Sequence, residues 1–173
     1  LRVVEKWAAP YVLVMTGVLL AWILYQAGGI GFLLHEPGKL NTFADFWPVF
    51  IPSLTGMIGF WATLSLNMPD FTRYGKSQRE QAVGQTVALP TTMVVFAAMG
   101  ILITSAAVVV FPQMNPADAW DPVKLVGQFS QPIVVAISMF TVVVATLSVN
   151  IAANVVSPAN DFANAFPKLI SFR

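Results

Sequence analysis

Two asparagines, Asn150 and Asn154, lie four residues apart in an otherwise apolar stretch near the C-terminal end of the chain. At about 100° per residue of an α-helix, they would lie about 40° apart on one helix face. Each carboxamide both donates and accepts hydrogen bonds, and an unpaired one in an apolar medium is costly. The pair therefore either joins neighbouring helices or binds the donor and acceptor groups of a small ligand, and the residues themselves leave both interpretations open.

Other polar side chains follow two lines along the same stretch. Thr146 and Ser157 fall on the face of the two asparagines if the helix is regular. Ser148 lies about 160° from Asn150, with Ala145 beside it. We therefore predict a helix that carries two separate polar lines.

An earlier apolar stretch carries two glycines immediately before two aromatic residues. Gly56 and Gly59 precede Phe60 and Trp61 near the middle of that stretch. Helices interrupted by glycine at mid-membrane are a sequence indication of a transporter binding site, and an indole offers a broad face for stacking a planar ligand. Tight packing of helices at small residues explains the glycines equally well. We predict a helix break at Gly56 and Gly59, with ligand binding and packing as alternative causes.

All of these residues lie within long stretches of sequence that carry no charged side chain. The chain of 173 residues is 57% hydrophobic and 10% charged, whereas soluble domains carry about 25% charged residues. Asp, Glu, Lys and Arg are missing from 7–34, 46–69, 81–117 and 125–160, and each stretch exceeds the roughly 20 residues that cross a bilayer. We predict an all-α polytopic membrane protein with four transmembrane helices in a single membrane region, 1–173. The spans are expected at about 7–27, 47–68, 81–110 and 132–156.

Composition argues against several other classes of protein. Four such stretches in one short chain leave too little polar surface to enclose them as the core of a soluble protein. The net charge of +1, without a basic cluster, predicts no nucleic-acid partner, and a chain without cysteine offers no thiolate metal site. The one histidine, His35, is expected in a loop, and no motif of metalloproteases or serine hydrolases occurs, so no enzyme is predicted. The ends at Leu1 and Arg173 indicate an internal fragment.

The basic residues indicate an orientation in the membrane. If the first span leaves from the cytoplasm, the inside segments hold seven of the nine Lys and Arg, and the outer loops hold only Lys39 and Lys124. Short cytoplasmic loops carry an excess of Lys and Arg. We therefore expect a multi-pass protein of the cell membrane with both ends of this chain on the cytoplasmic side.

Two longer motifs resemble those of the nucleobase:cation symporter-1 family. Residues 66–74, LNMPDFTRY, resemble its LNIPDFTRYAKSQ signature, and residues 148–162, SVNIAANVVSPANDF, resemble its STNIAANVVSPANDF. The motifs occur in the expected order, and the likeness covers essentially the whole chain. The resemblance implies a leucine-transporter-type inverted-repeat fold, with the four spans as its fifth to eighth helices and the remaining helices elsewhere in a full-length chain.

For the substrate, the resemblance assigns roles by position. Trp61, with Phe60 beside it, matches the sixth-helix tryptophan that packs on the substrate ring. Asn150 and Asn154 match the eighth-helix asparagines that contact the substrate. The implied protein is a secondary active transporter that imports a nucleobase-like heterocycle or ureide, such as allantoin, uracil, cytosine or hydantoin, by alternating access coupled to a cation. The alternative is a structural membrane subunit whose asparagines only join helices.

For the coupling ion, the resemblance points to the other polar line. The backbone carbonyl of Ala145 and the hydroxyl of Ser148 match two ligands of the sodium site in sodium-coupled members. The next residue, a threonine in those relatives, is Val149 here, which offers no side-chain oxygen. Sodium and a proton therefore both remain candidate coupling ions, and no other cofactor is expected.

Overall fold

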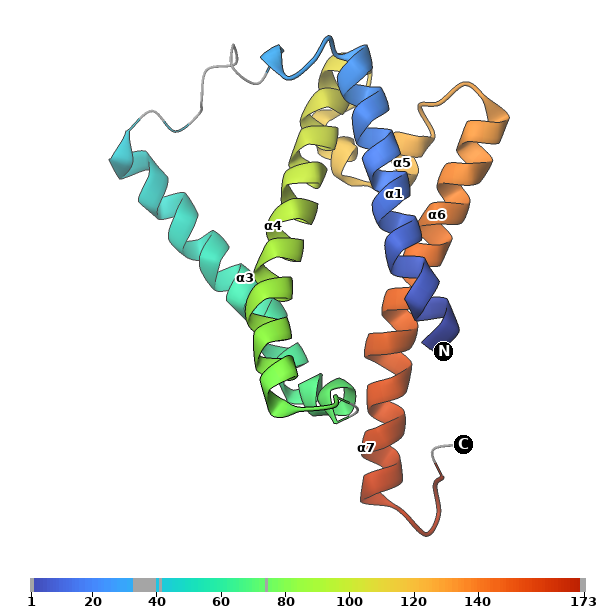
Figure 1. Cartoon of the computed structure of the whole chain (residues 1–173). Helices are drawn as coiled ribbons and strands as arrows, with labels where there is room; N and C mark the ends of the chain where they lie inside the picture. The colour runs from blue at the N-terminus through green and yellow to red at the C-terminus, as the bar shows by residue number, and fades with distance from the viewer. Residues whose placement is uncertain (1, 33–39, 41, 74, 172–173) are drawn as a thin grey trace. The chain divides into compact units, whose positions relative to one another are not determined.

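Four long apolar helices dominate the computed structural model, which describes residues 2–32, 40, 42–73 and 75–171 (Figure 1). His35, predicted to lie in a loop, falls outside these residues. No strand occurs in the described ranges. The long helices are α1 (Arg2–Gln26), α3 (Phe43–Thr72), α4 (Gln78–Val110) and α6 (Pro132–Asn150), the last of which continues through the π-helix η2 (Ile151–Val156) into α7 (Ser157–Ala165).

Each of the four predicted transmembrane segments corresponds to a helix that is long and apolar enough to cross a bilayer. The candidate spans are Lys6–Gln26, Phe43–Phe60, Gln78–Val110 and Pro132–Ala165. An all-α structure suits this apolar composition. The hydrocarbon of a bilayer contains no water to bond the backbone, and a helix pairs its own backbone donors and acceptors. The predicted class, an all-α polytopic membrane protein with four spans, is confirmed.

Two helices extend past the C-terminal boundaries that the sequence predicts. α3 passes Pro69 and ends at Thr72, because the Pro69 carbonyl still accepts a backbone N–H at 3.0 Å and a proline lacks only its own donor. The fourth helix is expected to end near residue 156 but reaches Ala165. Its extension is stabilised by Ser157 and Asn160, whose side chains find hydrogen-bond partners on α3.

Contacts divide the chain into two compact units, which we describe separately. Within the described ranges, one unit comprises residues 1–35 and 85–150, and the other comprises residues 36–84 and 151–173. The first unit therefore holds α1, most of α4, and α6. The second unit holds α3, η2 and α7. The expected single membrane region, 1–173, stays a prediction.

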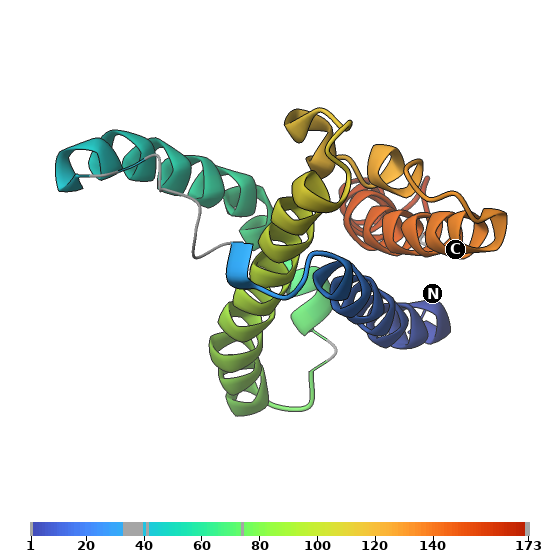
Figure 2. The same ribbon diagram turned by 90° about the horizontal axis from the view of Figure 1, so that it is seen from above.

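An apolar core organises the first unit. α1 packs along α6, and the two helices lie side by side in Figures 1 and 2. The short helices η1 (Pro116–Trp120) and α5 (Pro122–Val126) pack beside them. Small residues allow close approach of helices, as the complete burial of two alanines indicates. The core residues are Ile23, Ile103, Ala106, Ala107, Met114, Ala119 and Leu125.

Side-chain caps fix the segment between α4 and α6. Asn115 accepts a hydrogen bond of 3.0 Å from a backbone N–H of η1, and Asp121 accepts one of 2.9 Å from a backbone N–H of α5. Lys124 pairs with Asp118 at 2.6 Å on the surface. This hydrogen bond and the attraction of the Asp118 charge raise the pKa of Lys124 above 10.5.

Two glycines terminate α1. Gly28 and Gly29 have φ angles of 77° and 97°, and the Gly29 N–H donates to the Leu24 carbonyl at 2.8 Å. Such a bond closes a helix end and requires the left-handed region, where a residue with a Cβ is strained. The turn after the first span therefore depends on glycine.

The backbone conformation predicts the effect of an alanine at this turn. Gly29→Ala should destabilise the protein by about 1–2 kcal/mol, because an L-residue in the left-handed region costs about that much. No atom lies within 4 Å of a Cβ at Gly29, so the cost should come from the backbone alone. The measurement is the melting temperature of the purified protein in detergent. Gly31→Ala is the matched control, because that glycine has open space and no positive φ, and equal melting temperatures for the two variants would contradict the prediction.

Candidate functional site

The aromatic pair predicted to stack on a substrate lies on α3. Phe60 is 68% exposed within its unit. The backbone of Trp61 continues the helix, whereas its side chain lies outside the part of the chain that the structure describes. A ring as exposed as that of Phe60 can be covered by a ligand or by another helix, so the stacking role of this pair stays a prediction.

The predicted break at Gly56 and Gly59 is wrong for this structure. α3 runs without interruption from Phe43 to Thr72. Among the described residues only Gly28 and Gly29 have a positive φ. Glycine permits an unwound turn without requiring one, and an intact helix satisfies the backbone groups that a break would expose to hydrocarbon.

The irregular segment lies instead in the fourth span. The six residues of η2, Ile151–Val156, form a π-helix that contains Asn154. Each π turn holds about one residue more than an α turn, and such segments occur frequently at functional sites. No glycine or proline occurs within η2 to mark it, so the sequence did not predict it. The wider turn also breaks the regular spacing by which Ser157 was assigned to the face of the asparagines.

The two asparagines occupy different helical segments. Asn150 is the last residue of α6 and donates through Nδ2 to the Thr146 carbonyl at 3.0 Å, within the same helix. Asn154 lies in η2 and is exposed within its unit.

Contacts within the second unit bring three of the four predicted substrate residues onto touching elements. α3, which carries Phe60 and Trp61, contacts η2, which carries Asn154, and also contacts α7. Asn150 belongs to the other unit. The second unit thus combines an aromatic pair and a carboxamide on adjacent helices.

The two residues that are predicted to bind a cation, Ala145 and Ser148, do not share the apolar cavity of the first unit. Ala145 lines a cavity of about 330 Å³ between α1, α4 and α6, and Ser148 is not among the residues that line it. The hydroxyls of Thr16, Thr104 and Thr141 at this cavity donate to carbonyls of their own helices. Sodium requires several oxygen ligands, so the described lining of this cavity suits an apolar neighbour better than an ion.

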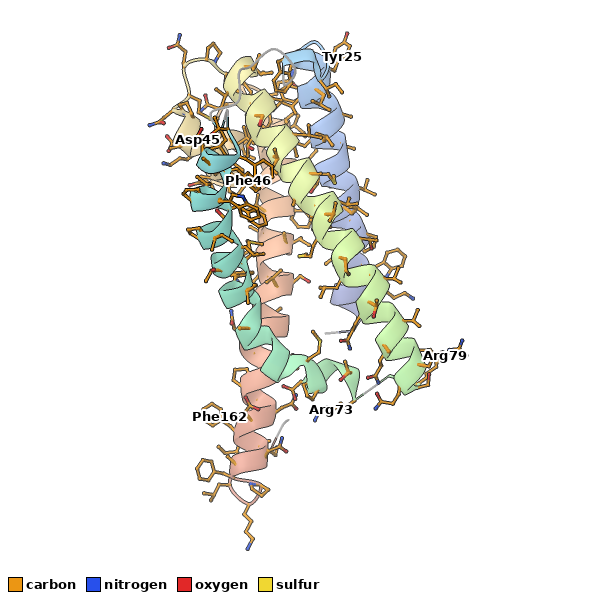
Figure 3. All side chains as sticks on the ribbon, turned by 90° about the vertical axis from the view of Figure 1, so that its left-hand side faces the viewer. Tyr25, Asp45, Phe46, Arg73, Arg79 and Phe162 are labelled. Atoms are coloured by element: carbon orange, nitrogen blue, oxygen red, sulfur yellow. The ribbon has the colours of Figure 1, made fainter. Side chains whose placement is uncertain are left out.

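A hydrogen-bonded cluster joins the end of α3 to α7. Ser157 Oγ donates to Asp70 Oδ2 at 2.6 Å, and Asn160 Nδ2 donates to Asp70 Oδ1 at 3.1 Å. Arg73 Nη2 donates to Asn160 Oδ1 at 2.7 Å. Figure 3 labels Arg73 at the end of α3 and Phe162 on α7, the two elements that the cluster connects. We call these four residues the α3–α7 cluster.

The sequence did not predict this cluster. In the sequence, Asp70 and Arg73 are three residues apart, a spacing that predicts only a local contact between them on one helix. In the structure, Asp70 accepts from residues 87 and 90 positions away. Ser157 and Asn160 are 1% and 5% exposed, so their polar groups require these partners. One feature of the sequence could have indicated the cluster: each of the two motifs that resemble the family contains two of its four residues.

Comparison with known proteins gives one consistent result. The family described as permease for cytosine/purines, uracil, thiamine and allantoin matches residues 1–173. The chain is 46% identical over 170 residues to an allantoin permease of Bacillus subtilis, covering 98% of this chain and 34% of that protein. It is 43% identical over 172 residues to a purine-uracil permease of Arabidopsis thaliana, covering 99% of this chain and 28% of that protein.

More distant relatives carry related names. A uridine permease of Saccharomyces cerevisiae is 27% identical over 163 residues, covering 89% of this chain and 25% of that protein. This chain thus spans about a third or less of the length of these relatives. No solved structure shows significant similarity to it. The resemblance found in the two motifs is confirmed, and these relatives are transport proteins rather than enzymes.

The α3–α7 cluster predicts a specific loss of stability. Ser157→Ala removes a hydroxyl donor from the Asp70 carboxylate and should cost about 1.5–3 kcal/mol, as for other hydrogen bonds to charged groups. The measurement is thermal unfolding of the purified protein. Ser53→Ala is the matched control in the same unit, because its hydroxyl is exposed and donates to the Val49 carbonyl of its own helix at 2.7 Å. If both variants melt alike, the cluster contributes nothing measurable.

Proposed function

Because this chain belongs to the family of permeases for cytosine/purines, uracil, thiamine and allantoin, we propose that it forms part of a secondary transporter for a nucleobase-like heterocycle or ureide. Allantoin, uracil, cytosine and hydantoin are the candidate substrates. The chain covers about a third of its bacterial relative, so the complete transporter includes further helices. We propose that these four spans are the fifth to eighth helices of an inverted-repeat fold, with both ends of the chain cytoplasmic and the protein in the cell membrane.

The observation that supports this substrate class is the contact between α3 and η2. Candidate substrates are flat and present alternating N–H and C=O groups at their edges. An indole or phenyl face such as that of Trp61 or Phe60 can stack on the ring. A carboxamide such as that of Asn154 can pair with an edge, because it supplies a donor and an acceptor together. Asn150, four residues earlier in the fourth span and in the other unit, carries a second carboxamide and stays a candidate substrate residue from the sequence.

We also propose that transport of the substrate is coupled to the movement of a cation. Ala145 and Ser148 are the candidate sodium ligands, and Val149 is 67% exposed and supplies no oxygen beside them. Sodium binds through several oxygen atoms, so a site lacking one hydroxyl binds it more weakly. A proton is the alternative coupling ion. Bilayer lipid and the small-molecule substrate are the expected partners.

The proposed role of Asn154 predicts a loss of substrate affinity. Asn154→Ala in the full-length protein should raise the KM for uptake about tenfold, which corresponds to the loss of a net hydrogen-bond contribution of roughly 1–1.5 kcal/mol. The measurement is uptake of radiolabelled substrate into cells at matched surface expression. Asn164→Ala is the matched control, because this exposed asparagine lies on α7 beyond the candidate site.

The same uptake assay identifies the substrate when unlabelled compounds compete with the labelled one. Unlabelled allantoin, uracil, cytosine and hydantoin are each added in excess, and the transported compound should compete most strongly. Unchanged KM in Asn154→Ala, together with no competition by any of the four, would refute the proposed function. A structural membrane subunit would then be the remaining interpretation of the chain.

The side chain at position 149 should determine how strongly uptake depends on the sodium concentration. Val149→Thr adds a hydroxyl next to Ser148 and should lower the sodium concentration for half-maximal uptake severalfold, because the ion gains an oxygen ligand. The measurement is uptake as sodium is replaced by choline at constant pH. Val149→Ala is the control for the change in side-chain size. If neither variant changes the sodium response, Ala145 and Ser148 do not belong to the coupling site.

A further inference from the structure

The α3–α7 cluster is the most extensively hydrogen-bonded side-chain network among the described residues, and the proposed substrate site does not use it. Three hydrogen bonds of 2.6, 2.7 and 3.1 Å connect four side chains from two helices. One of these helices, α3, carries the aromatic pair. The other, α7, directly follows the π turn that carries Asn154. Any movement between α3 and α7 therefore changes the spacing of the candidate substrate residues.

The described contacts at this junction are polar. Among the second unit's residues whose burial the structure describes, Ser157 and Asn160 are the buried ones, whereas the buried hydrophobic residues described in the chain lie in the first unit. Apolar burial is lost when helices separate into water, because nothing replaces it. Hydrogen bonds to Asp70 can instead be exchanged for bonds to water when the helices separate. Such bonds therefore permit the α3–α7 contact to open and close.

The geometry also indicates the role of the Asp70 carboxyl group. Both of its oxygens accept hydrogen bonds, one from a hydroxyl and one from an amide N–H. The Asp70 side chain therefore connects α3 to two successive turns of α7 at once.

We propose that the α3–α7 cluster is a latch that closes one end of the substrate pathway and must open once in each transport cycle. The inference rests on the proposed function, because only a transporter needs this movement. Asp70 is the central residue: it accepts hydrogen bonds from Ser157 and Asn160 directly, and Arg73, in the turn that follows α3, donates to Asn160. Closing joins the helix with Phe60 to the helix that follows Asn154, and opening releases them.

A reversible covalent bond in place of the latch provides the test. The side chains of Asp70 and Ser157 are short and their oxygens lie 2.6 Å apart, so Asp70→Cys with Ser157→Cys brings two thiols close together at this contact. The chain has no native cysteine, and any elsewhere in the full-length protein are replaced. The double variant is reconstituted in liposomes, oxidised, and assayed for uptake of the substrate identified by competition.

We expect the oxidised pair to lose about tenfold or more of its uptake rate, because a step that requires opening is blocked, and a reductant to restore it. Each single-cysteine variant should show the same uptake rate before and after treatment with the oxidant, whatever that rate is, because it cannot form the disulfide. Substrate binding by the oxidised pair should persist, which shows that the protein is folded. If the disulfide leaves the uptake rate unaffected, the proposed latch is wrong, and the cluster only stabilises a fixed contact between α3 and α7. Loss of uptake that persists after reduction, in a pair that still binds substrate, would also overturn the latch.

The wild-type protein separates this inference from the proposed function. If wild-type liposomes accumulate none of the four candidate compounds, the proposed transport function fails and the latch fails with it. If wild-type liposomes accumulate one of them while the disulfide has no effect, only the latch fails.

Discussion

The lack of water in hydrocarbon is the constraint on which this structure depends. Every backbone donor and acceptor inside a bilayer must be paired within the protein, and a helix does so by itself. Hydroxyl groups follow the same rule: Ser53, Thr55 and Thr91 each donate to a carbonyl one turn earlier in their own helix. Polar groups that cannot be satisfied locally must find partners on another helix, as Ser157 and Asn160 do at Asp70.

The two units satisfy this constraint in different ways. In the first, apolar side chains and small residues such as Ala106 bring α1, α4 and α5 together around a common core. In the second, the buried side chains among the described residues are polar and are bonded to Asp70. An apolar core holds one arrangement firmly, whereas a small hydrogen-bonded junction can exchange its partners with water. Under the proposed function, the hydrogen-bonded junction of the second unit is the contact that we propose to move.

The α3–α7 cluster also links the family motifs to a physical role. The motif at residues 66–74 contributes Asp70 and Arg73, and the motif at residues 148–162 contributes Ser157 and Asn160. The second motif contains Asn154 as well, so one short segment supplies a candidate substrate residue and half of the junction that holds it. Recognition of a flat polar ring and control of access to it would then depend on neighbouring turns of the same helix.

The sequence by itself determined the four spans, the class of fold and the family, because hydrophobic length and motif spacing are properties of contiguous residues. It failed at Gly56 and Gly59, since a glycine allows a helix break but the pairing of neighbouring backbone groups decides whether one forms. The tertiary structure alone decided the π turn at Asn154 and the partners of Asp70. Those partners lie 87 and 90 residues along the chain, and only folding brings such distant polar groups within hydrogen-bond distance.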